Sequence, residues 1–298
     1  MAFYQSQNER NFRVTDPFIR VTNDVEQIRL QLNSCSVDIG LNCCATGNRG
    51  PFNLPNEGTI AIGCEAANST IFPDGEGYQE VDAIAIGHQA GQFSQETLAV
   101  AIGHQAGQYH QLTRSIAIGG EAGNTGQQDR CVAVGRYAGR ENQGTGSGGQ
   151  GYSVAIGPYA GEINQNFYSV AVGVDAGYDN QQPYSVAVGP QAGDFDQGTG
   201  CVAVGRYAGY SNQGANSVAI GNSSGQTNQG QYSVAIGTLA GQTNQSANSI
   251  VLNADISALN AANSGLFAKP VRGLNLPSAG WFQLYYNPTT GEIAYDST

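Results

Sequence analysis

One short sequence unit returns along most of this chain at a fixed interval, and that interval constrains the fold more than any other feature. The unit reads S-[VI]-A-[VI]-G-x-x-A-G-x-x-x-Q. Strict self-similarity indicates a repeat architecture, in which each unit buries its apolar face only against its neighbours. Its first glycine recurs every 16 residues within two runs, at Gly87, Gly103, Gly119 and Gly135, and then at Gly157, Gly173, Gly189, Gly205, Gly221 and Gly237.

Each unit predicts one coil of an all-β, parallel β-solenoid of the β-roll type. Sixteen residues at about 3.3 Å each are too few for a wide triangular coil once turns are included, so we expect two short strands per coil. About eleven coils stacked about 4.8 Å apart would form a rod of roughly 50 Å. Weaker copies of the unit occur at Gly63 and in Ser36–Gly40. After Gly237, Asn253 takes the next position of the first glycine, 16 residues further on. The longer intervals, 24 residues after Gly63 and 22 after Gly135, predict loops at one corner of the stack.

Alternation along S-V-A-I-G predicts two different faces for each strand. Val154 and Ile156 should lie on one face, and Ser153 and Ala155 on the other. We expect the β-branched face to fill the interior and the first glycine to turn the strand with a positive φ. The Ser/Ala face would then be flat, small and nearly uncharged. We expect it to form the contact of a homotrimer with cyclic symmetry, the alternative being a solvated sheet.

A glutamine follows the first glycine by eight residues in every regular unit. Stacked identical amides form hydrogen bonds along the axis, so a structural ladder is a better expectation than a catalytic role. The predicted ladder consists of Gln95, Gln111, Gln127, Gln143, Gln165, Gln181, Gln197, Gln213, Gln229 and Gln245.

Composition limits the possible partners. The net charge is −11, and the 12 Lys and Arg residues form no cluster. Nucleic acids and anionic membranes both require clustered positive charge, so neither is an expected partner. No apolar stretch approaches the roughly 18 residues of a membrane span, and the N-terminal residues lack the pattern of a signal peptide. The six cysteines show no framework spacing, which favours synthesis in a reducing compartment.

Two non-repetitive segments flank the repeats. Residues 1–57 predict an N-terminal cap or anchor with a short strand from Phe18 and one helical turn, and residues 58–257 form the repeat domain. Residues 258–298 predict a C-terminal cap, because NPTTGE is a turn signal between the strand-like segments FQLYY and EIAY. Capping is needed because bare terminal coils expose strand edges.

The repeated SVAIGxxAG, over residues 58–253, resembles the head repeats of trimeric autotransporter adhesins of the YadA type. This resemblance implies a left-handed parallel β-roll that forms trimers, although coils of that family are usually shorter. The C-terminal NAANSGLFAKPVRG and LYYNPTTGEIAYDST resemble the ends of fibre and appendage proteins of large DNA viruses and phages. Together the two resemblances imply a virion fibre, spike or minor capsid component that contacts other virion proteins.

Aromatic residues are the main candidates for contact with a partner. Tyr152, Tyr168 and Tyr184 precede the repeat serine in three successive units, and they predict either cross-strand packing or a platform for a sugar or receptor. Trp281 and Phe282 begin an apolar cluster that predicts either a cap or a docking patch.

Features that suggest catalysis or metal binding have simpler explanations. His88 and His104 occupy equivalent positions one coil apart without a carboxylate or cysteine at ligand spacing, so no metal is expected. The DxD of Asp194–Asp196 reads as a surface turn. The 16-residue period also differs from the 18-residue coil of hexapeptide acyltransferases, the enzyme alternative. We therefore expect a non-enzymatic virion protein without a cofactor, and as alternative an adhesin head that binds a host receptor or glycan.

Overall fold

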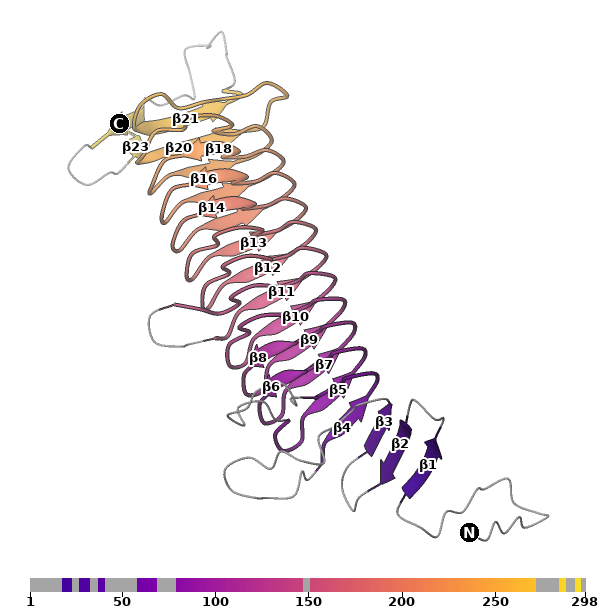
Figure 1. The fold of residues 1–298 in the computed structure, drawn as a ribbon. Coiled ribbons are helices and arrows are strands. Elements are labelled where there is room, and N and C mark those ends of the chain that lie inside the picture. Colours follow the sequence, from indigo (N-terminus) through magenta and orange to yellow (C-terminus); the bar gives the residue numbers. More distant parts are fainter. Residues whose placement is uncertain are drawn as a thin grey trace.

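The computed structural model describes residues 18–22, 27–32, 37–40, 58–68, 79–146, 151–271, 284–287 and 293–295. These residues form strands and turns and contain no helix, which confirms the all-β prediction. Figure 1 shows the repeats stacked as successive coils of an elongated rod, with the first coils near the N-terminal strands and the last near the C-terminus. Parallel strands recur at intervals of about 16 residues through about 11 turns, so the chain is a β-solenoid.

The V-A-I segment of every coil contributes one strand to a single 16-stranded sheet that follows the rod (Figure 1). Neighbouring strands pair in parallel and in register, so that Val132 lies beside Val154 and Ala133 beside Ala155. In spatial order the strands are β1 (Phe18–Thr22), β2 (Gln27–Leu32), β3 (Val37–Gly40), β4 (Ile60–Ile62), β5 (Ile84–Ile86), β7 (Val100–Ile102), β9 (Ile116–Ile118), β10 (Val132–Val134), β11 (Val154–Ile156), β12 (Val170–Val172), β13 (Val186–Val188), β15 (Val202–Val204), β17 (Val218–Ile220), β19 (Val234–Ile236), β20 (Ser249–Asn253) and β21 (Gly265–Lys269).

The opposite side of each coil contains the residues that end with the repeat glutamine. There the regular strands are shorter and form two parallel groups, β6 (Phe93–Gln95) with β8 (Tyr109–Gln111), and β14 (Phe195–Gln197), β16 (Ser211–Gln213) and β18 (Thr227–Gln229). Single bridges such as Glu141 with Ile163 connect most of the intervening coils. Each coil is therefore a flattened loop with one regular and one partly regular side, as its length predicts.

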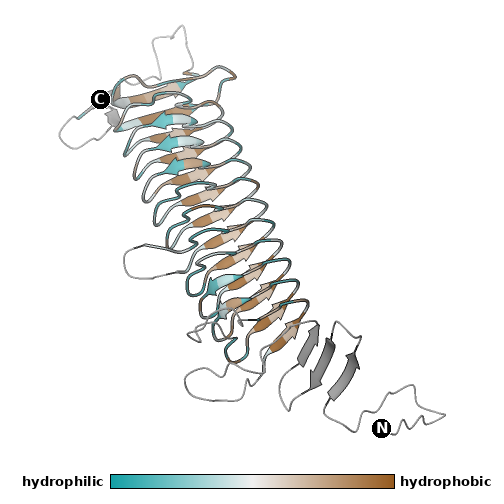
Figure 2. Ribbon diagram, in the orientation of Figure 1, coloured by the Kyte–Doolittle hydropathy of each residue, from teal (hydrophilic) through white to brown (hydrophobic). Residues whose placement is uncertain are grey.

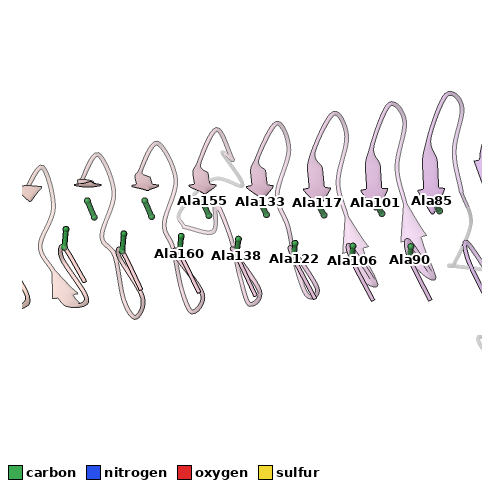
Figure 3. Close-up of a cluster of buried hydrophobic side chains, with 14 of the residues drawn as sticks. Ala85, Ala90, Ala101, Ala106, Ala117, Ala122, Ala133, Ala138, Ala155 and Ala160 are labelled. Carbon is green, nitrogen blue, oxygen red and sulfur yellow. The ribbon is translucent and has the colours of Figure 1, made fainter. Parts of the chain in front are cut away.

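The two faces of the main strands are the reverse of our sequence expectation. Ala155 and its equivalents have no exposed surface, whereas Ile156 is 41% exposed. The strand alanines face a second row of alanines from the A-G pairs, as Ala85 and Ala90 or Ala155 and Ala160 show in Figure 3. Where the main strand faces the A-G pair, a sixteen-residue coil is so narrow that both positions carry alanine in almost every turn. The prediction that valine and isoleucine fill the interior was wrong for this reason.

The remaining interior is occupied by the ten glutamines, which are all nearly or completely buried. In most coils the amide Nε2 donates one hydrogen bond to a main-strand carbonyl, as Gln165 does to Val154, and another to the Oε1 of the next glutamine, 3.0 Å away in Gln181. Buried polar groups need such partners, because an unpaired amide would cost about 1–3 kcal/mol. The glutamine column thus fills the space that alanine leaves and satisfies its own amides in most coils, whereas the Oε1 of Gln245 has no partner among the described residues.

Gln79 is an eleventh member of this column that the sequence reading missed. It is buried and donates to Gln95 Oε1 at 3.1 Å. The sequence signal that could have identified Gln79 is its position 16 residues before Gln95. The insertion obscured this signal, because Gln79 does not follow Gly63 by the usual eight residues. Its register also corrects the prediction that both insertions leave the same corner. The extra residues before Gln79 precede the column residue of their coil, whereas those near 147–150 follow Gln143.

The two repeat glycines are required for different reasons. Gly173 and its equivalents have positive φ, as expected, and a Cβ on Gly173 would lie 2.8 Å from the backbone of Gly189 in the next coil. The glycine of the A-G pair meets the glutamine column instead, since a Cβ on Gly161 would lie 2.7 Å from the Gln165 amide carbon. Any larger residue would separate the coils at the first position and displace the column at the second.

Both ends of the chain contain antiparallel pairs. β1 pairs with β2 and β2 with β3, and β3 then pairs in parallel with β4. The strand expected from Phe18 is present, but β2 occupies residues where a helical turn was considered. Near the C-terminus, β22 (Leu284–Tyr286) pairs with β23 (Ile293–Tyr295), as the turn signal predicted. Trp281 and Phe282 lie outside the described residues.

Candidate interaction surfaces

The outer face of the main sheet exposes a continuous apolar stripe, which we call the Val/Ile stripe. It consists of the first and third residues of each main strand from β4 to β19, such as Val154 and Ile156 in β11, and of Ile250 and Leu252 in β20. These side chains are half-buried or exposed in every coil. Figure 2 shows hydrophobic residues along the main-sheet strands, whereas strands β16 and β18 of the opposite side are hydrophilic. Exposed apolar patches of this extent mark interaction surfaces in soluble proteins.

The buried alanines rule out the protomer contact that we expected on the Ser/Ala face. Ala155 and Ser153 have no exposed surface, and the Ser153 hydroxyl donates to the backbone carbonyl of Asn166 inside the coil. Neither side chain is accessible to a second chain. If the rods associate through their main sheets, the contact must use the Val/Ile stripe.

A second surface lies at the corner just before each main strand, where three tyrosines stack in the manner the sequence suggested. The ring centroids of Tyr152 and Tyr168 lie 5.2 Å apart, and those of Tyr168 and Tyr184 lie 5.6 Å apart. The rings are nearly parallel, with interplanar angles of 8° and 6°. Arg130 continues the stack at one end, because its guanidinium carbon lies 5.1 Å from the Tyr152 ring centroid. We call this column the tyrosine ladder.

Phe167 supports the tyrosine ladder from its side. Its ring lies edge-on to Tyr168 and Tyr184, with centroids 5.8 Å and 5.4 Å away. Edge-to-face pairs of this kind add roughly 0.5–1.5 kcal/mol beyond their buried area. The tyrosine rings therefore stabilise one another by cross-strand packing and also remain partly accessible to solvent.

Acidic residues collect at the opposite corner, around the position that follows each A-G pair. Asp194 is only 3% exposed there, and its burial, with Asp175 nearby, raises its pKa to about 7. Burial also raises the pKa of Glu162, although the Arg140 guanidinium lies 3.1 Å from its Oε1. The second oxygen of Glu162 and the Nε of Arg140 have no hydrogen-bond partner among the described residues. The prediction that Asp194–Asp196 forms a surface turn was wrong, because Asp194 is buried and Asp196 is an exposed residue of β14.

The remaining candidates lie on the surface or in the core without a site around them. His88 and His104 stack with centroids 5.3 Å apart, one coil apart as expected. Within the part of the chain that the structure describes, no three His, Cys, Asp or Glu residues gather in an arrangement that could hold a metal ion. Cys131 and Cys201 are buried in the positions that serine occupies elsewhere. No helix among the described residues is long and apolar enough to cross a membrane.

Comparisons with protein-family models, with curated proteins and with solved structures gave no match. The resemblances to YadA-type head repeats and to viral fibre ends therefore depend on the quoted sequence motifs alone.

Proposed function

We propose that this chain is a non-enzymatic structural rod of an assembled particle, in which the Val/Ile stripe forms the contact between copies. The observation that carries this proposal is the exposure of that stripe in every coil from β4 to β20. Burial of apolar surface contributes about 25 cal/mol per Å², so an association that covers the stripe is strongly favoured. The rod would provide rigidity and length rather than chemistry.

A second copy of the same chain fits the stripe better than an unrelated partner. Its exposed side chains repeat at one coil spacing, about 4.8 Å, and another copy presents the same spacing over the same length. In a cyclic trimer every pair of neighbouring copies makes the same contact, and closure of the ring limits growth into filaments. The resemblance to YadA-type heads favours three copies, and the resemblance of the C-terminal segment to fibre ends favours a virion as the particle.

Light scattering of the purified chain tests the association. We expect a mass near three times the 31.0 kDa of one chain. Replacing both Ile156 and Ile220 by Lys should reduce the mass to that of one chain, because both exposed side chains would place charges inside the contact. Thr125→Lys and Thr243→Lys together form the matched control, since these exposed residues lie on the opposite side of the coil.

Circular dichroism should show that both double variants keep the wild-type spectrum. A wild-type chain that is monomeric at all concentrations, with the stripe accessible, would overturn the association.

The particle is tested separately by mass spectrometry of purified virions from the source of this chain. A chain that is missing from washed particles but abundant in the surrounding lysate would contradict a virion role.

A further inference from the structure

The tyrosine ladder ends at Tyr184 because the next position is a glycine. Gly200 takes the position one coil further, since its backbone N–H donates to the Pro183 carbonyl at 3.0 Å. Asn216 follows it in the same way, with a bond of 2.9 Å to the Thr199 carbonyl. Gly200 therefore stands between Tyr184 and Asn216 and contributes no side chain to the ladder.

The exposure of the three rings reflects this interruption. Tyr152 is 43% exposed and Tyr168 is 40% exposed, because each has a planar group on both faces, but Tyr184 is 59% exposed. Its first face rests on Tyr168. Gly200 places no side chain against its second face, and the Asn216 side-chain oxygen leans toward this position, 2.8 Å from where a Gly200 Cβ would lie. Two coil steps, about 9.6 Å, separate Tyr184 from the Asn216 position. A flat ring therefore has a stacking position against Tyr184 once the Asn216 side chain turns aside.

Polar groups border this gap. Thr199 and Asn216 are both exposed, and among the described residues neither side chain takes part in a hydrogen bond. The Thr199 hydroxyl can both donate and accept a hydrogen bond. The Asn216 amide donates through its nitrogen and accepts through its oxygen. The gap thus combines one aromatic face, held rigidly by Tyr168 and Phe167, with nearby groups that suit hydroxyls.

We propose that the gap over Gly200, bounded by Tyr184 and Asn216, binds a pyranose ring of a neutral glycan. The apolar C–H face of the sugar stacks on the Tyr184 ring, and its hydroxyls bond to Thr199 and Asn216. A nucleobase would bring phosphates to a chain of net charge −11, where binding requires clustered positive charge. A proline-rich peptide needs a groove with several aromatic rings, but here a single face is open.

This inference is independent of the association between copies, because the tyrosine ladder lies at a corner of the coil and not on the Val/Ile stripe. One stacked sugar with two hydrogen bonds would bind weakly, with a dissociation constant on the order of 1 mM. A trimer would carry three such gaps, and simultaneous contacts would raise the apparent affinity for a surface with many glycans.

The test begins with the full chain on an array of neutral and sialylated glycans. An NMR titration of the best neutral oligosaccharide then compares three variants with the wild type. Tyr184→Ala removes the stacking face, and we expect at least tenfold weaker binding. Gly200→Asn fills the gap, and the same loss is expected although Tyr184 remains.

Gly200→Asn is compatible with the fold, because Asn216 and Asn248 occupy equivalent positions with φ of 57° and 56°, against 68° at Gly200. The Asn216 side-chain oxygen, 2.8 Å from the added Cβ, must move aside. Tyr152→Ala is the matched control, since it removes an equally large ring from the other end of the ladder and should leave binding unchanged. Thermal unfolding and light scattering should match the wild type in all three.

Either of two results would overturn the glycan site. One is the absence of binding to any neutral glycan on the array. The other is unchanged affinity in both Tyr184→Ala and Gly200→Asn. A proline-rich peptide that binds the wild type and loses affinity in both variants would assign the gap to a different class of ligand. None of these results alters the mass of the assembly, so a failure here is distinguishable from a failure of the proposed rod.

Discussion

At the scale of single residues, the chain contains a buried acid without a nearby cation. Asp194 is almost completely buried, with Asp175 and Asp179 as its charged neighbours and only a side-chain hydrogen bond from Gln191 to favour its ionised form. Its pKa rises from 3.8 to about 7, so the folded chain binds a proton more tightly than the unfolded chain. The stabilisation from that proton is complete below pH 4 and is lost as the pH rises through 7.

Asp194→Asn should therefore stabilise the chain at pH 8, by on the order of 2 kcal/mol, and have little effect near pH 4. The measurement is the urea midpoint of unfolding at a series of pH values for both proteins. Asp196→Asn, an exposed acid two residues away, serves as control and should keep the wild-type pH dependence. Parallel pH profiles for wild type and Asp194→Asn would contradict the role of Asp194.

At the scale of the coil, the volume between the two sides decides which strand face is buried. Ala171 in β12 lies in a row of alanines that faces a second row, and the glutamine column fills the rest of the section. The neighbouring Val172 faces outward and is half-buried. From β4 to β19 the inner position holds only alanine, whereas the outer position holds valine or isoleucine. Val251 takes the inner position in β20, near the end of the stack.

Ala171→Leu should destabilise the rod by about 3 kcal/mol, because extra methylene groups in a closely packed interior force the two sides apart. Val172→Ile, which enlarges the adjacent outer residue to the side chain that β11 carries at the same position, should change stability by less than about 1 kcal/mol. Urea midpoints at one pH compare the two. Equal tolerance at both positions would show that the interior is less closely packed than the structure indicates.

The sequence predicted the period and the strand positions correctly, because glycine spacing and β-branched residues are local signals. The orientation of the strands could not be obtained in the same way. Alternation places Ala155 and Ile156 on opposite faces but does not say which face is inside. Hydrophobicity alone favours isoleucine inside, and only the width of a sixteen-residue coil favours alanine. The stacking of Tyr152, Tyr168 and Tyr184 followed from the period, whereas the significance of Gly200 required the register of the coils.

At the scale of the whole molecule, stability is distributed along a single axis. Each coil contacts only the coils before and after it, through parallel strand pairs such as β15 with β17 and through the glutamine column. Repeat proteins of this kind behave as a sum of units and nearest-neighbour contacts. Coils with the same period are therefore exchangeable in a way that elements of a globular core are not.

Deletion of residues 206–221, one complete period, should leave a folded rod whose thermal midpoint lies within about 5 °C of the wild type. The deletion joins Gly205 to Asn222 and keeps every glutamine of the column in register. Deletion of residues 206–213 removes half a period and should lower the thermal midpoint clearly more, because Gln197 then has no column partner one period further along the chain. Thermal circular dichroism compares the two, and similar curves would contradict the stacking argument.

The glutamine column has a direction as well as a structure. From Gln79 to Gln197 every Nε2 donates to the Oε1 of the glutamine in the next coil, so the bonds run in one direction as far as Gln213. Each amide is polarised by the one behind it, so the bonds strengthen one another in a dry interior. Their dipoles add instead of cancelling, as peptide dipoles do in a helix. The column therefore gives the rod a dipole along its axis, with the positive end toward the C-terminus. Three parallel copies in an assembly would align three such dipoles side by side.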